Sequence, residues 1–224
     1  MTTQATVVLV AGSLHYDIIV EADHLPRRDE TGIGRRWYPK FGGKGGNQAV
    51  SAQMQGVPAR LFAAIGADAF GIFLRDRLDS NGIDHRHVAV CPGSGSGISV
   101  ATLDAAGDYA ATIVSGANLL LDPAALREPA LWSDVGLLVL QNEIPEPVNI
   151  AAAEQARRRG IPTLLNAAPC REMSAEFQRL VDILVVNTVE AEMMGTAPIT
   201  SLNTAADAAR MLAGRFKTVI VTAG

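Results

Sequence analysis

The feature that most constrains the fold is the alternation of apolar strands and helix-forming segments after residue 122. A strand that is apolar at nearly every position is buried on both faces, and helices between such strands connect them in parallel. The pattern predicts an α/β fold in which a mostly parallel central sheet carries helices on both faces. The strand-like runs are VGLLVLQ, IPTLLN, DILVVN and KTVIVTAG, joined by TVVLVA and ARLFAAIG nearer the N-terminus.

Two other pairs of strand-like runs alternate between polar and apolar residues. They lie within about residues 14–40 and 97–116, and the second pair surrounds an Ala-Ala-Gly-Asp turn. Alternation is typical of strands with one exposed face, so these runs predict a small antiparallel sheet attached to the edge of the central sheet. We expect residues 1–224 to form one domain. Its last run, Thr218–Thr222, is of the buried type, which indicates either an incomplete domain or a strand that closes a sheet edge.

Charge and cysteine content exclude some classes of function. The formal net charge of −4 argues against a broad nucleic-acid-binding surface but allows a small anionic ligand. The two cysteines, Cys91 and Cys170, form no CxxC pair and fit a reducing cytosol, so we expect a cytoplasmic protein. The N-terminal segment has no basic n-region, and its apolar run is too short for a signal peptide or a membrane span.

Polar residues cluster where the predicted parallel strands end. Ligands of open parallel sheets bind beyond the carboxyl ends of the strands, so these residues predict one shared cleft. The alternative is that Asn, Asp and Ser stand there only as turn and helix-cap formers. The residues in question are Gly12, Ser13, His15, Asp17, Asn142, Glu143, Asn166, Pro169, Asn187, Glu190, Thr222 and Gly224.

The stretch FGGKGGNQAV, residues 41–50, places four glycines around Lys44. It is not a Walker A loop, because Gly45 follows the lysine where Ser or Thr is required, and it does not follow the first strand as a dinucleotide-binding loop does. Consecutive glycines let the backbone approach a ligand and expose N–H groups at a helix N-terminus. Lys44 adds positive charge and Asn47 offers a donor and an acceptor, which suits a hydroxylated ligand that becomes anionic.

The chain resembles the ribokinase family of carbohydrate kinases, also called the PfkB family, in four segments. These are GSLHYD, FGGKGGNQAV followed by AAIGADAFG, GISVATLDAAGDYAATIVSGAN, and VDILVVNTVEAE. The resemblance implies a three-layer α/β/α sandwich with a small β-sheet lid, which mediates dimer formation in many members. It also implies a reaction in which the γ-phosphoryl group of ATP, with Mg²⁺, passes to a primary hydroxyl of a pentose-like sugar.

The resemblance assigns the sugar-binding side to a few residues. It implies that Asp17 binds sugar hydroxyl groups, that Gly43, Lys44 and Asn47 line the same sugar, and that Glu143 completes this wall.

One residue of that side departs from the family pattern. His15 stands where ribokinases usually carry Asn, so the identity of the sugar stays open at this point.

The resemblance also assigns the nucleotide side. Asn187 and Glu190 match the family's Asn-x-x-Glu, which acts near the magnesium ion and the phosphates, so Glu190 would act on the metal indirectly. Thr222 and Gly224 match the start of the nucleotide-binding segment.

The catalytic Gly-Ala-Gly-Asp motif of the family, with its proton-accepting Asp and its anion hole, is not among these 224 residues. Neither is the monovalent-cation site, for an ion such as K⁺, that many members have. Those parts carry most of the catalysis of phosphoryl transfer. We therefore expect the N-terminal part of a kinase, with no catalytic residue of its own and no activity as it stands.

Two other functions stay open on the sequence alone. A nucleoside kinase of the same family would use the same hydroxyl-binding residues, and Tyr16, Trp37 and Tyr38 are candidates for stacking on a base. A non-catalytic sugar-binding protein would need no catalytic segment. A dinucleotide oxidoreductase is disfavoured, because its glycine fingerprint is absent.

The remaining histidines are expected to play no part in the site. His24, His85 and His87 are expected to be solvated surface residues, because their surroundings in the sequence are polar.

Overall fold

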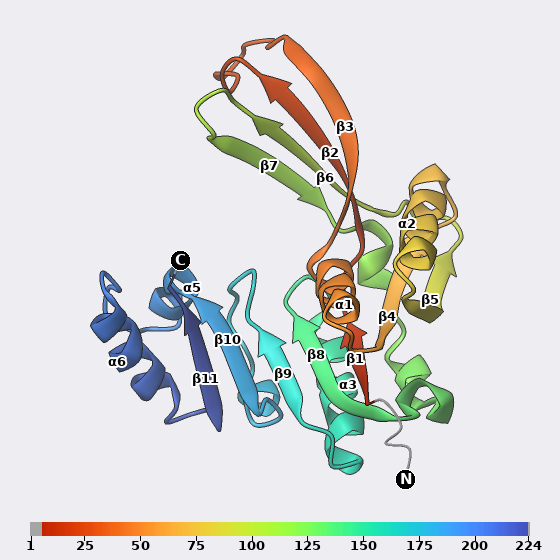
Figure 1. The fold of residues 1–224 in the computed structure, drawn as a ribbon, viewed down its shortest axis with the longest axis vertical. Helices are drawn as coiled ribbons and strands as arrows, with labels where there is room; N and C mark the ends of the chain where they lie inside the picture. The colour runs from red at the N-terminus through yellow and green to blue at the C-terminus, as the bar shows by residue number, and fades with distance from the viewer. Residues whose placement is uncertain (1–5, 224) are drawn as a thin grey trace.

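The central sheet of the computed structural model has seven strands in the order β11-β10-β9-β8-β1-β4-β5, and the structure describes residues 6–223 (Figure 1). Every neighbouring pair in this sheet is parallel. The prediction of a parallel central sheet is therefore confirmed. The strands are β1 Val7–Ala11, β4 Ala59–Gly66, β5 Asp84–Cys91, β8 Val135–Gln141, β9 Thr163–Asn166, β10 Ile183–Asn187 and β11 Thr218–Thr222.

Helices cover both faces of this sheet and complete the predicted three layers. On one face, Leu74 and Leu78 of α2 pack with Leu61 and Ile65 of β4 in one apolar cluster. A second cluster, which includes Phe177, fills the other face. Within residues 6–223 no helix is both long and apolar enough to span a membrane. The first face carries α1 (Lys44–Met54) and α2 (Ala69–Ser80), and the second carries α3 (Glu146–Arg158), α4 (Ala175–Gln178), α5 (Thr188–Met193) and α6 (Leu202–Leu212).

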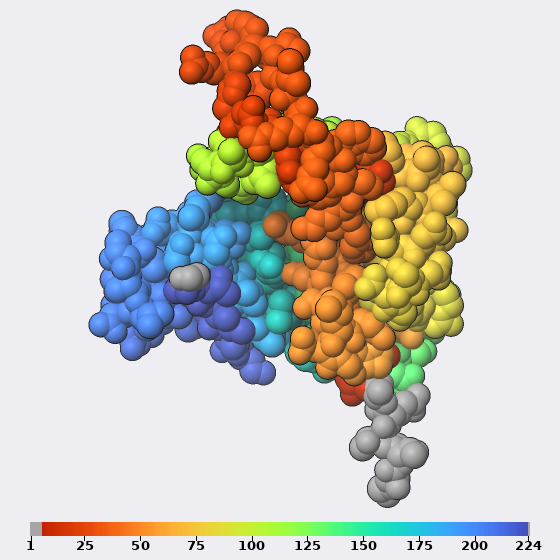
Figure 2. Space-filling view, turned by 45° about the horizontal axis from the view of Figure 1, so that its top comes forward, coloured from red at the N-terminus to blue at the C-terminus, as the bar shows by residue number. Residues whose placement is uncertain are grey.

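The helix layer formed by α1 and α2 covers only part of its face. Residues that share a register in parallel strands point to the same side, which places Leu164, Ile183, Val185 and Ile220 on the face of α1 and α2. The first three are partly exposed, and Ile220 is 46% exposed. Figure 2 shows a recess there, between α1 in orange and the C-terminal segment in blue.

The small sheet projects from one end of the body as a lid (Figure 1). Its order is β3-β2-β6-β7, and its outer pairs are antiparallel. The central pair, β2 with β6, is parallel, so the prediction of a fully antiparallel lid is wrong. Both strands leave the body in the same direction and their hairpin partners return, which makes the central pairing parallel. The strands are β2 His15–Ala22, β3 Gly34–Gly42, β6 Gly97–Leu103 and β7 Tyr109–Val114.

Strand β5 and a run of short 3-10 helices were not predicted. The first half of β5, DHRHVAVC, is polar, which an edge strand tolerates because one side of it has no neighbouring strand. Its histidines are not freely solvated as predicted: the side chains of His85 and His87 are 23% and 11% exposed, and they face Asp79 and Glu128. His24 lies on the lid, where its exposed ring contacts Glu30. The 3-10 helices are η1 Gly116–Leu120, η2 Pro123–Arg127 and η3 Pro129–Trp132.

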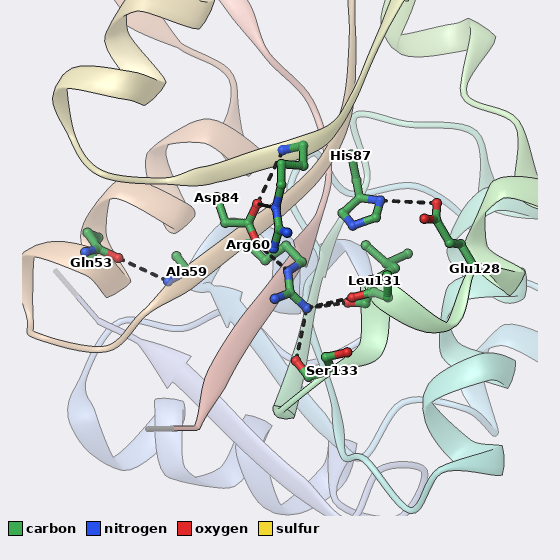
Figure 3. A network of polar contacts seen from close by, with 10 residues as sticks. Gln53, Ala59, Arg60, Asp84, His87, Glu128, Leu131 and Ser133 are labelled. Carbon is green, nitrogen blue, oxygen red and sulfur yellow. Dashed lines mark hydrogen bonds and ion pairs between the residues drawn. The ribbon is translucent and has the colours of Figure 1, made fainter. Parts of the chain in front are cut away.

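A buried arginine ties η3 to the edge of the sheet (Figure 3). Arg60 of β4 donates from Nε to Asp84 Oδ2 at 2.7 Å and from Nη1 to the carbonyls of Leu131 at 2.9 Å and Ser133 at 3.0 Å. The hydrogen bond from Arg86 lowers the pKa of Asp84 well below its usual range, and Arg60 adds to this effect. A buried charge is tolerated only with such partners, so this network joins the edge of the sheet to an irregular segment whose Leu131 and Trp132 are also buried in the core.

Candidate functional site

A cavity of about 520 Å³ lies between the lid and the start of α1. The side chains of His15 and Asp17 reach it from the same face of β2, as their spacing of two residues predicts. Residues far apart in the sequence therefore meet at one place. All six residues predicted to contact the sugar line this cavity: His15, Asp17, Gly43, Lys44, Asn47 and Glu143.

Glu143 joins three segments at the floor of the cavity. Its Oε2 accepts a hydrogen bond from Ser13 Oγ at 2.5 Å and another from the backbone N–H of Lys44 at 2.8 Å. Lys44 is the first residue of α1, so the carboxylate lies at the positive end of the helix dipole. The loop after β1, the loop after β8 and the N-terminus of α1 are thereby held together.

The glycines of the FGGKGGNQAV stretch serve close backbone packing. Gly43 has a φ of 86°, and a Cβ on Gly45 would lie 2.6 Å from the backbone nitrogen of Ser13. The N–H of Gly46 donates to the Ser13 carbonyl at 2.9 Å, and the N–H of Lys44 donates to Glu143. The prediction that these glycines expose helix N–H groups to a ligand is therefore wrong, because Ser13 and Glu143 accept them.

His15 is almost fully buried, with 3% of its surface exposed. Burial lowers the pKa of His15, with Lys44 acting in the same direction and Glu143 in the opposite one. Its imidazole is consequently neutral near pH 7, and its Nε2 has no hydrogen-bond partner within the described part of the chain. A neutral imidazole can donate or accept one hydrogen bond at that atom, depending on its tautomer.

Asp17 is partly buried at the junction of lid and body. Burial raises the pKa of Asp17 to about 6, an effect that Glu143 adds to and Lys40 opposes. A carboxylate in this position gains much from hydroxyl donors, because they replace the water that burial removed.

Three of the predicted nucleotide-side residues do not line this cavity: Asn187 and Thr222 end β10 and β11, and Glu190 lies in the helix that follows β10. Asn187 caps α5: its Oδ1 accepts from Glu190 N at 2.7 Å, and Glu190 Oε2 accepts from Asn187 N at 2.9 Å. Thr222 pairs in register with Asn187, and its hydroxyl lies 3.4 Å from the carbonyl oxygen of Val186. Gly224 lies outside the described residues.

The aromatic residues singled out from the sequence separate into two groups. Tyr38 lines the cavity, whereas Trp37 is its neighbour on β3 and so points to the other face of the lid. Tyr16 stacks on Phe70 at 4.3 Å between ring centroids and meets Phe73 edge-on at 4.8 Å, so it anchors the lid to α2. Tyr109 of β7 also lines the cavity and was missed, although its alternation within the hairpin would have placed it on the face of Ala111.

Within residues 6–223 no group of three or more His, Cys, Asp and Glu side chains is placed to hold a metal ion. Glu190 is 9% exposed, and it offers a carboxylate beside the amide of Asn187. Mg²⁺ is commonly held by one or two carboxylates together with substrate phosphates, and a single carboxylate fits that donor set.

Comparison with known proteins agrees with this geometry. Residues 5–224 match the pfkB family carbohydrate kinase. The chain belongs to this family. The mouse (Mus musculus) ribokinase is 31% identical over 224 residues, which is 99% of this chain and 69% of that protein. The deoxyribokinase of Salmonella typhi is 30% identical, over 97% of this chain and 72% of its own length.

A solved relative gives the same fold. The structure of Arabidopsis thaliana ribokinase complexed with ribose and ATP superimposes with a TM-score of 0.86 at 27% identity, covering 97% of this chain and 72% of that one. The ribokinase-like α/β fold predicted from the sequence is therefore confirmed, and the chain is a carbohydrate kinase by family.

Proposed function

We propose that the cavity between lid and body binds the acceptor of an ATP-dependent sugar kinase, a pentose-like sugar with a primary hydroxyl. The observation that carries this proposal is the convergence of His15, Asp17, Lys44, Asn47 and Glu143 on one cavity of about 520 Å³. A small number of polar groups in a largely preformed cavity is the usual form of a small-molecule site.

Each residue has a distinct role in this proposal. Asp17 accepts hydrogen bonds from sugar hydroxyls, Asn47 both donates and accepts, and neutral His15 bonds one hydroxyl through Nε2. Glu143 holds the floor in place through Ser13 and the N–H of Lys44. The ammonium of Lys44 lies where the transferred phosphoryl group arrives and offsets its charge.

The nucleotide side of the reaction is assigned to the ends of β10 and β11. Asn187 and Glu190 would act near the phosphates, with Glu190 acting on Mg²⁺ indirectly, and Thr222 and Gly224 would begin the nucleotide-binding segment. When bound, ATP supplies the phosphoryl group and Mg²⁺ neutralises its oxygens. A monovalent cation such as K⁺ is a further proposed cofactor, for which no site is proposed among residues 1–224.

The proton acceptor is not proposed among these residues, because the Gly-Ala-Gly-Asp sequence does not occur in them. We propose that residues 1–224 alone bind the sugar without phosphorylating it. Calorimetric titration with ribose and 2-deoxyribose, beside an assay of ADP release, tests both statements. Sugar binding without ADP release is the expected result, ADP release above background would contradict the proposed inactivity, and no binding of any pentose would contradict the proposed site.

A nucleoside kinase is the second candidate, favoured by Tyr38 and Tyr109 on the lid wall of the cavity. Tyrosine rings at that wall are placed to stack on a base attached to the sugar. Including inosine and adenosine in the same titration separates the two candidates. Tighter binding of the nucleosides than of ribose would favour the nucleoside kinase.

A non-catalytic sugar-binding protein is the third candidate, and it differs from a kinase in having no nucleotide affinity. Titration of ATP with Mg²⁺ in the presence of ribose distinguishes them.

We also propose a cytoplasmic homodimer that forms through the lid. The thiols of Cys91 and Cys170 are free, and the lid exposes Trp37 and Val114, which are 64% and 54% exposed. Sedimentation analysis tests the dimer, and substitution of Trp37 by Ser is expected to weaken it.

A further inference from the structure

A second cavity, of about 370 Å³, adjoins the acceptor cavity. His15, Ile113 and Glu143 line both cavities, so the two are contiguous. The second cavity extends toward the loops that follow β8 and β9, where Asn142 and Arg171 line it. No residue in these loops beyond Glu143 has a role in the proposed function.

Unsatisfied polar atoms gather at this second cavity. The described residues contain seven buried side-chain nitrogen or oxygen atoms without a hydrogen-bond partner, and five of them belong to His15, Asn142 and Arg171. All three residues line the second cavity. A buried polar atom without a partner is destabilising, so such a concentration at one place indicates a ligand that supplies the missing partners.

The unpaired N–H groups of Arg171 indicate which groups that ligand must carry. Its Nη1 donates to the carbonyl of Ile144 at 3.0 Å, which leaves Nε and Nη2 without partners. These two N–H groups are parallel donors on one side of the planar guanidinium, and they match two adjacent acceptor atoms. Asn142 is 5% exposed and adds an amide donor and acceptor, neither of which has a partner.

Arg171 also touches a cavity of about 460 Å³ lined by Met173, Met193 and Met194. That cavity includes neither His15 nor Asn142. Of the two cavities that Arg171 lines here, the one beside the acceptor site is therefore lined by all three residues that carry these unsatisfied atoms. Asn142 and Arg171 stand on loops, which can make the small side-chain adjustments that contact with a ligand requires.

We propose that Arg171 and Asn142 form a second subsite, which recognises a pair of adjacent hydrogen-bond acceptors on the ligand that occupies the acceptor cavity. This inference rests on the proposed acceptor site and adds a specificity to it. Two chemical groups present such a pair: a carboxylate, as in a sugar acid, and the O6 and N7 atoms of a 6-oxopurine nucleoside. A simple pentose leaves the subsite unused.

Matched ligand pairs test the subsite by calorimetric titration of the protein. Inosine and adenosine share a ribose and a purine ring, but adenosine presents an amino donor where inosine presents O6. Ribonate and ribitol differ in the carboxylate. We expect the acceptor-bearing member of at least one pair to bind at least tenfold more tightly than its partner, and the pair that discriminates identifies the source of the two acceptors.

The variant Arg171→Lys keeps the charge but removes the paired donors, so we expect it to reduce that ratio at least fivefold. Arg157→Lys, at an exposed arginine of α3, is the matched control and leaves the ratio unchanged. A purely structural role of Arg171 would weaken both members of a pair equally and would overturn the proposal.

The ligand pairs test the subsite even when the Arg171→Lys variant does not fold. Binding of ribose with no discrimination within either pair overturns the subsite and leaves the acceptor site standing. Failure of ribose and of every other ligand to bind contradicts the acceptor site itself, and the subsite with it.

Discussion

At the acceptor cavity, the polar groups that bond to one another come from distant parts of the chain, whereas at the ends of β10 and β11 they come from neighbours. Ser13 and Glu143 are 130 residues apart, but Asn187 and Glu190 are three apart. The first set exists only when the start of α1 and the loops after β1 and β8 are assembled. The second set forms with one short helix. The proposed recognition of the acceptor thus depends on the tertiary fold, while Asn187 and Glu190 are held together by local capping.

The largest effect on stability is expected from Gly45→Ala, at the contact between the start of α1 and the loop after β1. Alanine normally stabilises a helix interior relative to glycine, but here its Cβ would lie 2.6 Å from Ser13 N and 2.8 Å from the Gly12 Cα. We expect a loss of about 3 kcal/mol or more in the free energy of unfolding, measured by urea denaturation. Gly95→Ala is the control, because its Cβ would meet only Asp68 at 3.6 Å. A variant as stable as the parent would show that the close approach is not required.

Asp17→Asn is expected to have the next largest effect. The substitution keeps the shape of the side chain but removes the charge that accepts sugar hydroxyls, and hydrogen bonds to charged groups contribute about 1.5–3 kcal/mol. Ribose affinity should therefore fall roughly 30-fold in a calorimetric titration. The exposed Asp29 on the lid provides the control substitution to Asn. Equal losses in both variants would contradict the role of Asp17.

The pH dependence of binding follows from the same carboxyl group. Its pKa is about 6, so Asp17 is mostly protonated at pH 5 and mostly ionised at pH 7. Only the ionised form accepts hydrogen bonds at both oxygens, so ribose affinity should fall about tenfold as the pH is lowered from 7 to 5. A flat profile in the parent, or the same profile in the Asp17→Asn variant, would assign the titration to another group.

The smallest effects are expected from two Glu→Gln substitutions, one at the acceptor cavity and one after the end of β10. Glu143→Gln should weaken ribose binding about fivefold, because the neutral amide holds Ser13 and the Lys44 N–H less strongly. Glu190→Gln should change ribose affinity less than twofold and stability by under about 1 kcal/mol, because glutamine also completes a capping box. Titration of both variants with ribose measures the difference. A larger effect at Glu190 would mean that the two regions are coupled.

Much of the fold was predictable because its signals are local. The apolar runs of β1, β4 and β8 through β11 can be recognised without knowledge of their neighbours. Strand β5 has no such run: its charges are matched by Arg60 and Glu128, which lie 24 and 41 residues from their partners Asp84 and His87. The parallel pairing of β2 with β6 likewise depends on where both strands leave the body.

The residues of the site likewise separate into those that the sequence predicted and those that it did not. Of the six residues that line the acceptor cavity as predicted, His15, Asp17 and Glu143 follow the ends of parallel strands, which share one edge of a sheet. The other three, Gly43, Lys44 and Asn47, were predicted from the FGGKGGNQAV stretch and the family resemblance. The partners of the α1 N–H groups were not found, because Ser13 and Glu143 reach them only in the folded protein. Arg171 carried no signal in the sequence, since what distinguishes it is two nitrogens left without partners.

The stacking of Tyr16 between lid and body fixes the point about which the lid would rotate. Tyr16 lies at the root of β2, between His15 and Asp17, and its ring is held by Phe70 and Phe73. A rotation about this contact would displace the tip of the lid most and the two residues beside Tyr16 least. In such a rotation His15 and Asp17 would stay nearly fixed, and Tyr109 at the hairpin end of β7 would move farther.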